Sequence, residues 1–414
     1  MDIETPTRLT YTRLFREWNF LILWVGYLIS YIGEYFILLA IPIAVEKLTG
    51  STLMVGLSVI SEAIPMLLLG PVAGVFVDRW NRKNTMVTSS LIRAALVLVL
   101  LLVQTADQVW IFYVIGFLMS CVSRFFHPAM NAILPQIVKD DNDLLAANGL
   151  MQLVTTVGLL AGPAMAGLSI GYWGTSIAFI IDSICLLIAG LVIMMLRPPQ
   201  LRSPELLKGF YTIWSDLKDG VQYLFTNQTM VGVMIVLVVT QLGFGAINVV
   251  WVPYLQRTFG IGAEGLGIVD SAQGAGMVLA GILLGYLSRK FLKTTLIGGG
   301  VLIMGLSFAA IGFAPIFFYV VVFSFILGFG FIPAQSAVMT LIQLAVPDEK
   351  RGRISSAQVA LRTAAGLLSM AFASAFAEMV GHRTIYVICG LIVTLGGFLA
   401  FFVLREPVQS NLEN

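Results

Sequence analysis

The chain has 414 residues, of which 58% are hydrophobic and only 11% are charged, and its formal net charge is +2. This composition is far too apolar for a water-soluble domain, and the continuous apolar runs are about twice as long as the ~10-residue alternating strands of a membrane β-barrel. The chain is therefore expected to be a helical membrane protein, and its small net charge gives no reason to expect a nucleic-acid partner.

Apolar runs of about the ~20 residues that a spanning helix needs recur along the whole chain. We therefore expect an all-α membrane protein with 12 transmembrane helices. The predicted spans are residues 18–45, 53–77, 85–103, 109–134, 144–170, 174–196, 229–255, 265–288, 294–313, 316–344, 354–378 and 385–404.

Lysine and arginine residues gather in alternate loops. Three basic loops, at residues 78–83, 289–293 and 349–353, fall on the same side as the two ends of the chain. By the positive-inside rule this side is cytoplasmic, which agrees with an even number of spans. Both termini are therefore expected in the cytoplasm.

The longest polar segment, residues 197–228, divides the chain into an N-terminal half, 1–196, and a C-terminal half, 229–414. Apolar residues recur in this linker at intervals of three and four, which predicts an amphipathic helix on the inner membrane surface; an unstructured linker is the alternative. The heptapeptides at 126–132 and 331–337 share four of seven residues and lie in equivalent spans. We therefore expect two parallel six-helix halves around a central cavity.

The end of the second span carries a glycine, an Asp-Arg pair and two more basic residues, which are Gly74, Asp78, Arg79, Arg82 and Lys83. The spacing resembles the loop signature of the major facilitator superfamily, in which this element latches the inner face shut. A glycine allows close helix approach, a carboxylate can meet a helix N-terminus, and the basic residues hold the turn in the cytoplasm. The counterpart in the second half lacks the acid, so we expect an asymmetric latch. A purely topogenic loop is the alternative.

The fifth span carries Gly158, Gly162, Pro163 and Gly167. Glycines four residues apart allow tight packing, and the proline removes one backbone hydrogen bond and bends the helix. The segment resembles the antiporter signature of the same family, which is associated with exporters. Ordinary small-residue packing is the alternative.

The wider pattern, from the Phe-His-Pro-Ala segment at 126–129 to the Gly-Arg pair at 352–353, resembles the macrolide-efflux and enterobactin-exporter branch of that family. The resemblance implies a secondary active transporter, and no enzyme, that exports amphipathic small molecules of the drug, macrolide or siderophore type by proton antiport and alternating access. It also implies a multi-pass monomer in the lipid of a bacterial inner (plasma) membrane. No cofactor or metal is expected, and the proton gradient would supply the energy.

Ionisable residues inside spans cost about 2.5 to 3.5 kcal/mol on insertion scales, so they are functional candidates. Counting along the spans places the acids in the outer half of the membrane and the bases in the inner half. Glu34, Asp182 and Glu62, in that order, are the candidates for proton coupling, because an apolar cavity favours a neutral carboxyl group and brings proton exchange towards neutral pH. Asp270 and Glu378 have an alternative role as residues at span ends.

Aromatic and polar side chains on several spans are expected to line the cargo cavity. These residues are Tyr31, Tyr35, Arg124, His127, Gln241, Asn248 and Gln358. A mostly uncharged wall in the second half suits a hydrophobic cargo, and a packing role is the alternative for His127. Arg93 and Arg362 are expected to meet carbonyl groups or to reach the inner headgroups.

The sequence has no nucleotide-binding loop, metal-ligand cluster or nucleophile elbow, which argues against ATP-driven pumping and hydrolysis. Two rival functions use the same fold. A lipid or lysolipid flippase would open sideways to the bilayer and ignore the proton gradient. An importer of small solutes is less favoured, because of the signature in the fifth span.

Overall fold

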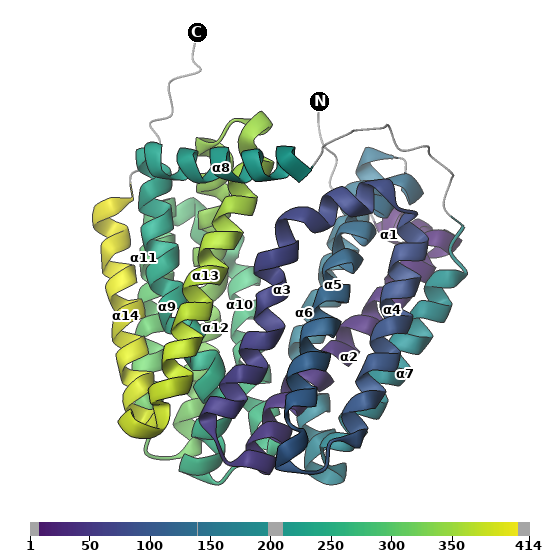
Figure 1. Ribbon diagram of the computed structural model, residues 1–414. Coiled ribbons are helices and arrows are strands. Elements are labelled where there is room, and N and C mark those ends of the chain that lie inside the picture. The colour runs from purple at the N-terminus through teal and green to yellow at the C-terminus, as the bar shows by residue number, and fades with distance from the viewer. Residues whose placement is uncertain (1–7, 139, 198–209, 405–414) are drawn as a thin grey trace. The chain divides into compact units, whose positions relative to one another are not determined.

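The computed structural model describes residues 8–138, 140–197 and 210–404, and every regular element in these ranges is a helix (Figure 1). Among the described residues, 12 helices are long and apolar enough to cross a membrane, which confirms the predicted all-α architecture. The elements are α1 (Arg8–Arg16), α2 (Trp18–Thr49), α3 (Thr52–Arg79), α4 (Arg82–Val99), the short 3₁₀ turns η1 (Leu100–Leu102) and η2 (Ala106–Gln108), α5 (Trp110–Ile137), α6 (Asp141–Trp173), α7 (Thr175–Met194), α8 (Phe210–Thr226), α9 (Gln228–Phe259), α10 (Ala263–Lys290), α11 (Lys293–Gly312), α12 (Phe317–Ala345), α13 (Asp348–Val380) and α14 (His382–Val403).

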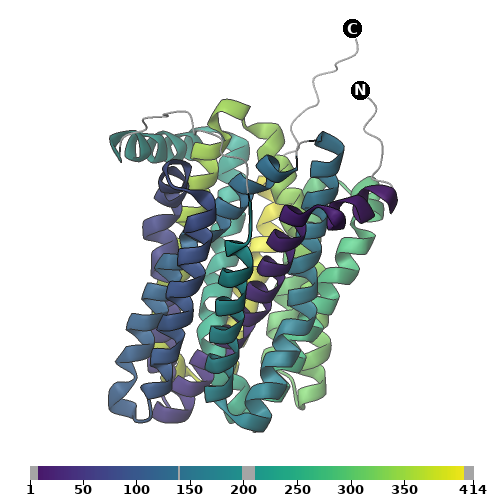
Figure 2. The same cartoon turned by 90° about the vertical axis from the view of Figure 1, so that its right-hand side faces the viewer.

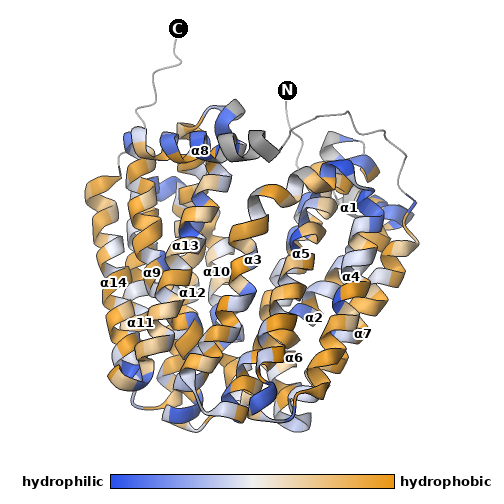
Figure 3. Cartoon of the chain, viewed as in Figure 1, coloured by the Kyte–Doolittle hydropathy of each residue, from blue (hydrophilic) through white to orange (hydrophobic). Residues whose placement is uncertain are grey.

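Apolar residues cover the long helices, and hydrophilic residues gather near their ends and on α8 (Figure 3). Large apolar side chains also remain exposed on the protein surface, for example Ile282 at 74% and Phe402 at 81%. Water would make such exposure unfavourable, whereas lipid tails are as apolar as these side chains. The surface is therefore that of a protein embedded in a bilayer.

Glycine ends α2 and α9 in the same way. Gly50 and Gly260 follow these helices with φ angles of 57° and 66°, in the left-handed region that other residues rarely adopt. Their backbone N–H groups donate to the carbonyl oxygens of Glu46, at 2.8 Å, and Gln256, at 3.0 Å. Two helices at equivalent places in the chain order thus share one stop signal.

The described residues form two compact units. Unit 1 comprises the described parts of Met1–Gly50, Ser61–Lys208 and Gly262–Gly267, and unit 2 those of Ser51–Ile60, Gly209–Ile261 and Ile268–Asn414. Two short segments, 51–60 and 262–267, thus belong to a different unit than chain order suggests. The domain division at 1–196, 197–228 and 229–414 stays a prediction.

The two units share one packing plan. In unit 1, α2 packs against α6 and α7, and α4 packs against α5 and α7. In unit 2, α9 packs against α13 and α14, and α11 packs against α12 and α14. The related heptapeptides at 126–132 and 331–337 lie in α5 and α12, which occupy equivalent places in the two plans. The plan is that of an internal repeat, as the sequence predicted.

The core of unit 1 lies where α2, α5 and α6 meet. Fully buried side chains there include Phe20 and Leu23 of α2, Ile133 of α5 and Val154 of α6. The short helix α1 runs at an angle to α2 at one end of this unit (Figure 2). This core holds α2 and α5 in the positions from which they supply the charged residues described below.

The predicted linker helix is present as α8, which lies across the ends of neighbouring helices in unit 2 (Figure 1). It is fixed to the start of α13, because Nη1 of Arg353 lies 3.4 Å from Oδ2 of Asp219 and Lys350 stands 5.2 Å from the ring centroid of Tyr223. The linker prolines lie outside the described residues. The helical interpretation is therefore confirmed for residues 210–226.

Candidate functional site

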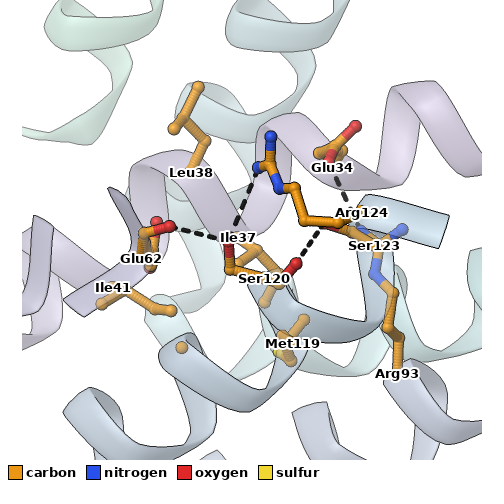
Figure 4. A pocket seen from close by; sticks show the side chains of 11 residues that line it. Glu34, Ile37, Leu38, Ile41, Glu62, Arg93, Met119, Ser120, Ser123 and Arg124 are labelled. Atoms are coloured by element: carbon orange, nitrogen blue, oxygen red, sulfur yellow. Dashed lines mark hydrogen bonds and ion pairs between the residues drawn. The ribbon is translucent and has the colours of Figure 1, made fainter. Parts of the chain in front are cut away.

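A cavity of about 190 Å³ lies within unit 1 between α2, α3, α4 and α5. Four ionisable side chains reach it: Glu34 from α2, Glu62 from α3, Arg93 from α4 and Arg124 from α5 (Figure 4). The other lining residues are Ile37, Leu38, Ile41, Gly116, Met119, Ser120 and Ser123. Two acids and two bases in one cavity of a membrane bundle indicate a functional site, because such groups are costly there.

Arg93 pairs with Glu34. Its Nη2 atom lies 3.5 Å from Oε1 of the acid, and the arginine side chain is 7% exposed whereas that of Glu34 is 42% exposed. The pair therefore joins a buried base to an acid that faces the cavity. The predictions that Arg93 meets carbonyl groups or headgroups, and that acids and bases are separated by depth, are wrong for this pair. A residue count along separate helices cannot show which side chains meet between them.

Arg124 connects to the wall of α3 through a hydroxyl group. Its Nη2 atom lies 3.5 Å from Oγ of Ser120, and this hydroxyl donates to the backbone carbonyl of Glu62 at 2.7 Å (Figure 4). Gly116 leaves room for the acid, since a Cβ atom at this position would lie 3.1 Å from Cγ of Glu62. Ser120 was not among the predicted site residues. Its position one helical turn before Arg124 was the available signal.

Asp182 on α7 lies outside the cavity lining but close to its charges. The residue is 0% exposed, and neither carboxyl oxygen has a hydrogen-bond partner among the residues that the structure describes. Gly33 of α2 borders it, because a Cβ atom there would lie 2.7 Å from Oδ1 of Asp182. Arg93 and Glu34 are the charged groups that interact with it electrostatically. The structure thus brings Glu34, Glu62 and Asp182 into one region of unit 1.

Tyr31 and Tyr35 pack against each other and against α6. Their ring centroids are 5.6 Å apart in an edge-to-face arrangement. A Cβ atom at Gly158 would overlap the ring of Tyr31, and one at Gly162 would overlap the ring of Tyr35. The predicted tight packing of these two glycines is therefore observed. Neither tyrosine lines the cavity of unit 1, and their contact with cargo stays a prediction.

The rest of the motif in the fifth span also lies in α6. Pro163 stands inside the helix. Gly167 packs against the first residues of α10, since a Cβ atom there would lie 2.9 Å from Cα of Gly267, within unit 1. The role of the motif in antiport stays a prediction.

The predicted latch surrounds the short turn between α3 and α4. Asn81 caps α4 by accepting a hydrogen bond from the N–H of Asn84 at 3.0 Å. A Cβ atom at Gly74 would meet no described atom within 4 Å, so no close helix approach at this glycine is seen within unit 1. Asp78 is exposed and makes no hydrogen bond or ion pair within the described ranges. Arg79 is exposed too, and a latch built on this turn stays a prediction.

The basic residues that follow the turn begin α4. Arg82 and Lys83 are its first two residues, and both are partly buried. Nε of Arg82 is buried without a hydrogen-bond partner in the described part of the chain.

Unit 2 has a second cavity, of about 110 Å³, between α9, α11, α12 and α13. It brings together two predicted cargo residues, Gln241 and Asn248, with Gln335 of α12 and Arg362 of α13. Gln335 was missed, although it lies in the repeated heptapeptide at 331–337. Arg362 was expected to meet carbonyl groups or headgroups, but it lines this cavity.

Like Tyr31 and Tyr35, two further predicted cargo residues line neither cavity. Gln358 is 9% exposed on α13, and His127 packs its ring edge-on against Tyr27 with centroids 6.1 Å apart. The contact of His127 agrees with the packing alternative.

Glu378 lies at the end of α13 and caps another helix. Its Oε1 atom accepts the backbone N–H of Thr52 at 2.9 Å and lies 3.7 Å from Nη1 of Arg257, within unit 2. The hydroxyl of Thr52 also lies 2.9 Å from Nε2 of His382. A carboxylate at a helix N-terminus is stabilising, so the geometry favours the structural alternative for Glu378.

Comparison with known proteins identifies the family. The model of the Major Facilitator Superfamily matches residues 23–242 and 233–414. Macrolide efflux protein A of Streptococcus pyogenes is 26% identical over 389 residues, which cover 92% of this chain and 95% of that protein. Macrolide efflux protein A of Enterococcus faecalis is 28% identical over 315 residues, which cover 74% and 95%.

Among solved structures, the nucleoside transporter NupG superposes with a TM-score of 0.78 at 14% identity, over 93% of this chain and 100% of that one. At this identity the likeness concerns the fold alone. The family model, in contrast, covers nearly all of the sequence. The chain therefore belongs to the Major Facilitator Superfamily and is a multi-pass membrane transporter rather than an enzyme.

Proposed function

We propose that this transporter exports amphipathic small molecules of the macrolide type in exchange for protons, by alternating access. The names of its relatives support the cargo class, and the charged cavity of unit 1 supports coupling to an ion. The proposal includes a bacterial inner membrane with both termini in the cytoplasm. It also includes a monomer in lipid that needs no cofactor.

The observation that carries the proposal is the Glu34–Arg93 pair. With Glu34 ionised, the buried guanidinium has a counter-charge at 3.5 Å. A proton on Glu34 removes that counter-charge, and a buried charge without a partner is strongly unfavourable. Proton binding therefore changes the relative free energies of any two states that differ in this contact, which is the requirement for coupling.

Asp182 supplies the second half of the proton exchange. Its unbonded carboxyl oxygens interact electrostatically with Arg93, so an ionised Asp182 is the alternative partner for the guanidinium once Glu34 is neutral. A cationic cargo at Glu34 would compete with the proton for the same carboxylate. Cargo and proton would then occupy the site in turn, as exchange requires.

The test is uptake of labelled erythromycin into inside-out vesicles, with and without an imposed pH gradient. We expect the gradient to drive uptake in the wild type and Glu34→Gln to abolish the gradient-driven part. Glu17→Gln is the matched control, because Glu17 is exposed and makes no side-chain cap hydrogen bond at the start of α2. Uptake that ignores the gradient and survives Glu34→Gln would refute proton coupling and favour a lipid or lysolipid flippase.

A further inference from the structure

The cavity of unit 2 differs in charge from the cavity of unit 1. Among its described lining residues, Arg362 is the single ionisable one, and it lies with the amide side chains of Gln241, Asn248 and Gln335. The other described lining residues are Val236, Leu237, Thr240, Phe244, Ile297, Val301, Met304, Phe331, Ala334 and Val338. No carboxylate is among the lining residues that the structure describes.

Arg362 and the three amides have unused hydrogen-bonding capacity. Within the described ranges, none of these four side chains has a hydrogen bond or an ion pair. Asn248 is exposed, and no side-chain nitrogen or oxygen atom of Gln241, Gln335 or Arg362 is sealed in the interior. Their polar atoms are therefore open to the cavity. A site that hydrogen-bonds a ligand group leaves its own polar groups unpaired in just this way when the ligand is absent.

The depth of Arg362 makes a purely anchoring role a poor explanation. The residue lies twelve positions after the start of the candidate span Lys350–Val380, which is about 18 Å along a helix that rises 1.5 Å per residue. The hydrocarbon core is ~30 Å thick, so this position is close to its middle. A guanidinium there is costly, and such residues usually mark a pathway or a ligand.

The size and walls of the cavity limit what it can hold. About 110 Å³ is well below the roughly 300 to 1,000 Å³ of pockets that enclose a drug-sized molecule. The cavity therefore takes one functional group of a larger cargo. Phe244 and Phe331, with ring centroids 6.4 Å apart, give that group an apolar border.

We propose that this cavity binds a carboxylate or ester group of the cargo, with Arg362 recognising its oxygen atoms. The planar guanidinium presents paired donors that match two oxygens on one carbon, and Gln241, Asn248 and Gln335 supply further N–H donors. The inference rests on the proposed export function and names the cargo chemistry that unit 2 selects.

The test compares three fluorescent dyes that share one tetraethyl-diaminoxanthylium cation. Rhodamine B carries a carboxylate, its ethyl ester carries an ester, and pyronin B lacks the carboxyphenyl ring. Equilibrium binding to the full-length purified transporter in detergent is measured by fluorescence polarisation. We expect the wild type to bind rhodamine B or its ester more tightly than pyronin B.

Arg362→Met should weaken binding of the preferred rhodamine on the order of ten- to a hundredfold and leave pyronin B unchanged, because charge-assisted hydrogen bonds are worth about that much. The Arg362→Lys variant distinguishes a carboxylate from an ester as the recognised group. This variant should retain most of the affinity for a dye with a carboxylate and should lose more affinity for a dye with an ester. Gln241→Leu should give a smaller loss with the same selectivity. Arg289→Met, at an exposed residue of α10, is the matched control.

Equal losses for all three dyes, no loss for any, or no binding by the wild type would overturn the inference. Melting temperatures of the variants separate unfolding from lost recognition, and Arg362→Lys serves if Arg362→Met does not fold. Dye binding does not depend on a pH gradient. Failure of the vesicle experiment above would therefore refute proton-coupled export while the role of Arg362 could still be measured.

Discussion

Nη2 of Arg93 lies 3.5 Å from Oε1 of Glu34, and the base is the more deeply buried partner. Removing the acid leaves the buried guanidinium without the counter-charge of Glu34, whereas removing both groups also removes the guanidinium that lost it. We expect Glu34→Gln to lower the stability of the protein in detergent by about 1 to 3 kcal/mol, and less if cavity water screens the pair. The double variant Glu34→Gln/Arg93→Gln should recover part of this loss. Thermal melting measures the stability of the single and the double variant. A double variant that is less stable than Glu34→Gln would contradict the pairing.

Gly162 leaves room for the ring of Tyr35, so an added methyl group should be destabilising. We expect Gly162→Ala to cost about 1 to 3 kcal/mol, as overpacking does, and Tyr35→Leu in the same chain to relieve it. Gly149→Ala is the control on the same helix, because a Cβ atom there meets nothing within 4 Å. The stability of Gly149→Ala should equal that of the wild type or exceed it by up to about 1 kcal/mol, because alanine has the higher helix propensity. Melting curves that rank the two alanine variants in reverse order would show that α6 packs differently.

Gly74 and Gly276 should respond in contrasting ways to the same substitution. Gly74 faces open space, whereas a Cβ atom at Gly276 would overlap the backbone carbonyl of Phe325, which cannot rotate away. We expect Gly74→Ala to leave the melting temperature unchanged or to raise it slightly, because alanine has the higher helix propensity. Gly276→Ala should lower the melting temperature clearly, with a loss of about 1 to 3 kcal/mol in the free energy of unfolding. A clear loss of stability in Gly74→Ala would contradict the open surroundings of this glycine.

Glu378 accepts the backbone N–H of Thr52 at the start of α3. Because the carboxylate interacts with the positive end of a helix dipole, Glu378→Gln should cost about 0.3 to 1 kcal/mol at low salt. The cost should shrink in 1 M salt, where the Debye length falls to about 3 Å. Melting temperatures at two salt concentrations provide the measurement, with Glu17→Gln as the control. A penalty that does not depend on salt would argue against the electrostatic explanation.

The helices themselves were predictable because lipid leaves the backbone few choices. Every N–H and C=O group in the hydrocarbon must be bonded internally, so an apolar run of spanning length becomes a helix. The predicted span 53–77 became α3 (Thr52–Arg79), and 174–196 became α7 (Thr175–Met194). The agreement at these ends reflects turn residues, such as Gly174 with its φ of 82°.

The meeting of side chains between helices was not predictable from hydropathy. A helix that is apolar on all sides gives no signal for its rotation about its own axis. Glu34 and Arg93 were therefore identified singly but not as a pair, and Arg362 was assigned to carbonyl groups or headgroups although it lines a cavity. Gly158 and Gly162 were identified as packing residues, while the tyrosines that cover them were assigned to cargo.

The two units repeat one arrangement of helices, but their cavities have different chemistry. One contains Glu34, Glu62, Arg93 and Arg124, and the other contains amides and Arg362. Internal duplication of this kind allows each copy to specialise, because a substitution in one cavity leaves the lining of the other untouched. Under the proposed division of roles, variation at Gln241, Asn248 or Gln335 would alter the range of exported compounds over evolutionary time without disturbing the ion pair in unit 1. Resistance to a new antibiotic would then arise by substitutions in unit 2, while the proposed proton-coupling site in unit 1 is inherited unchanged.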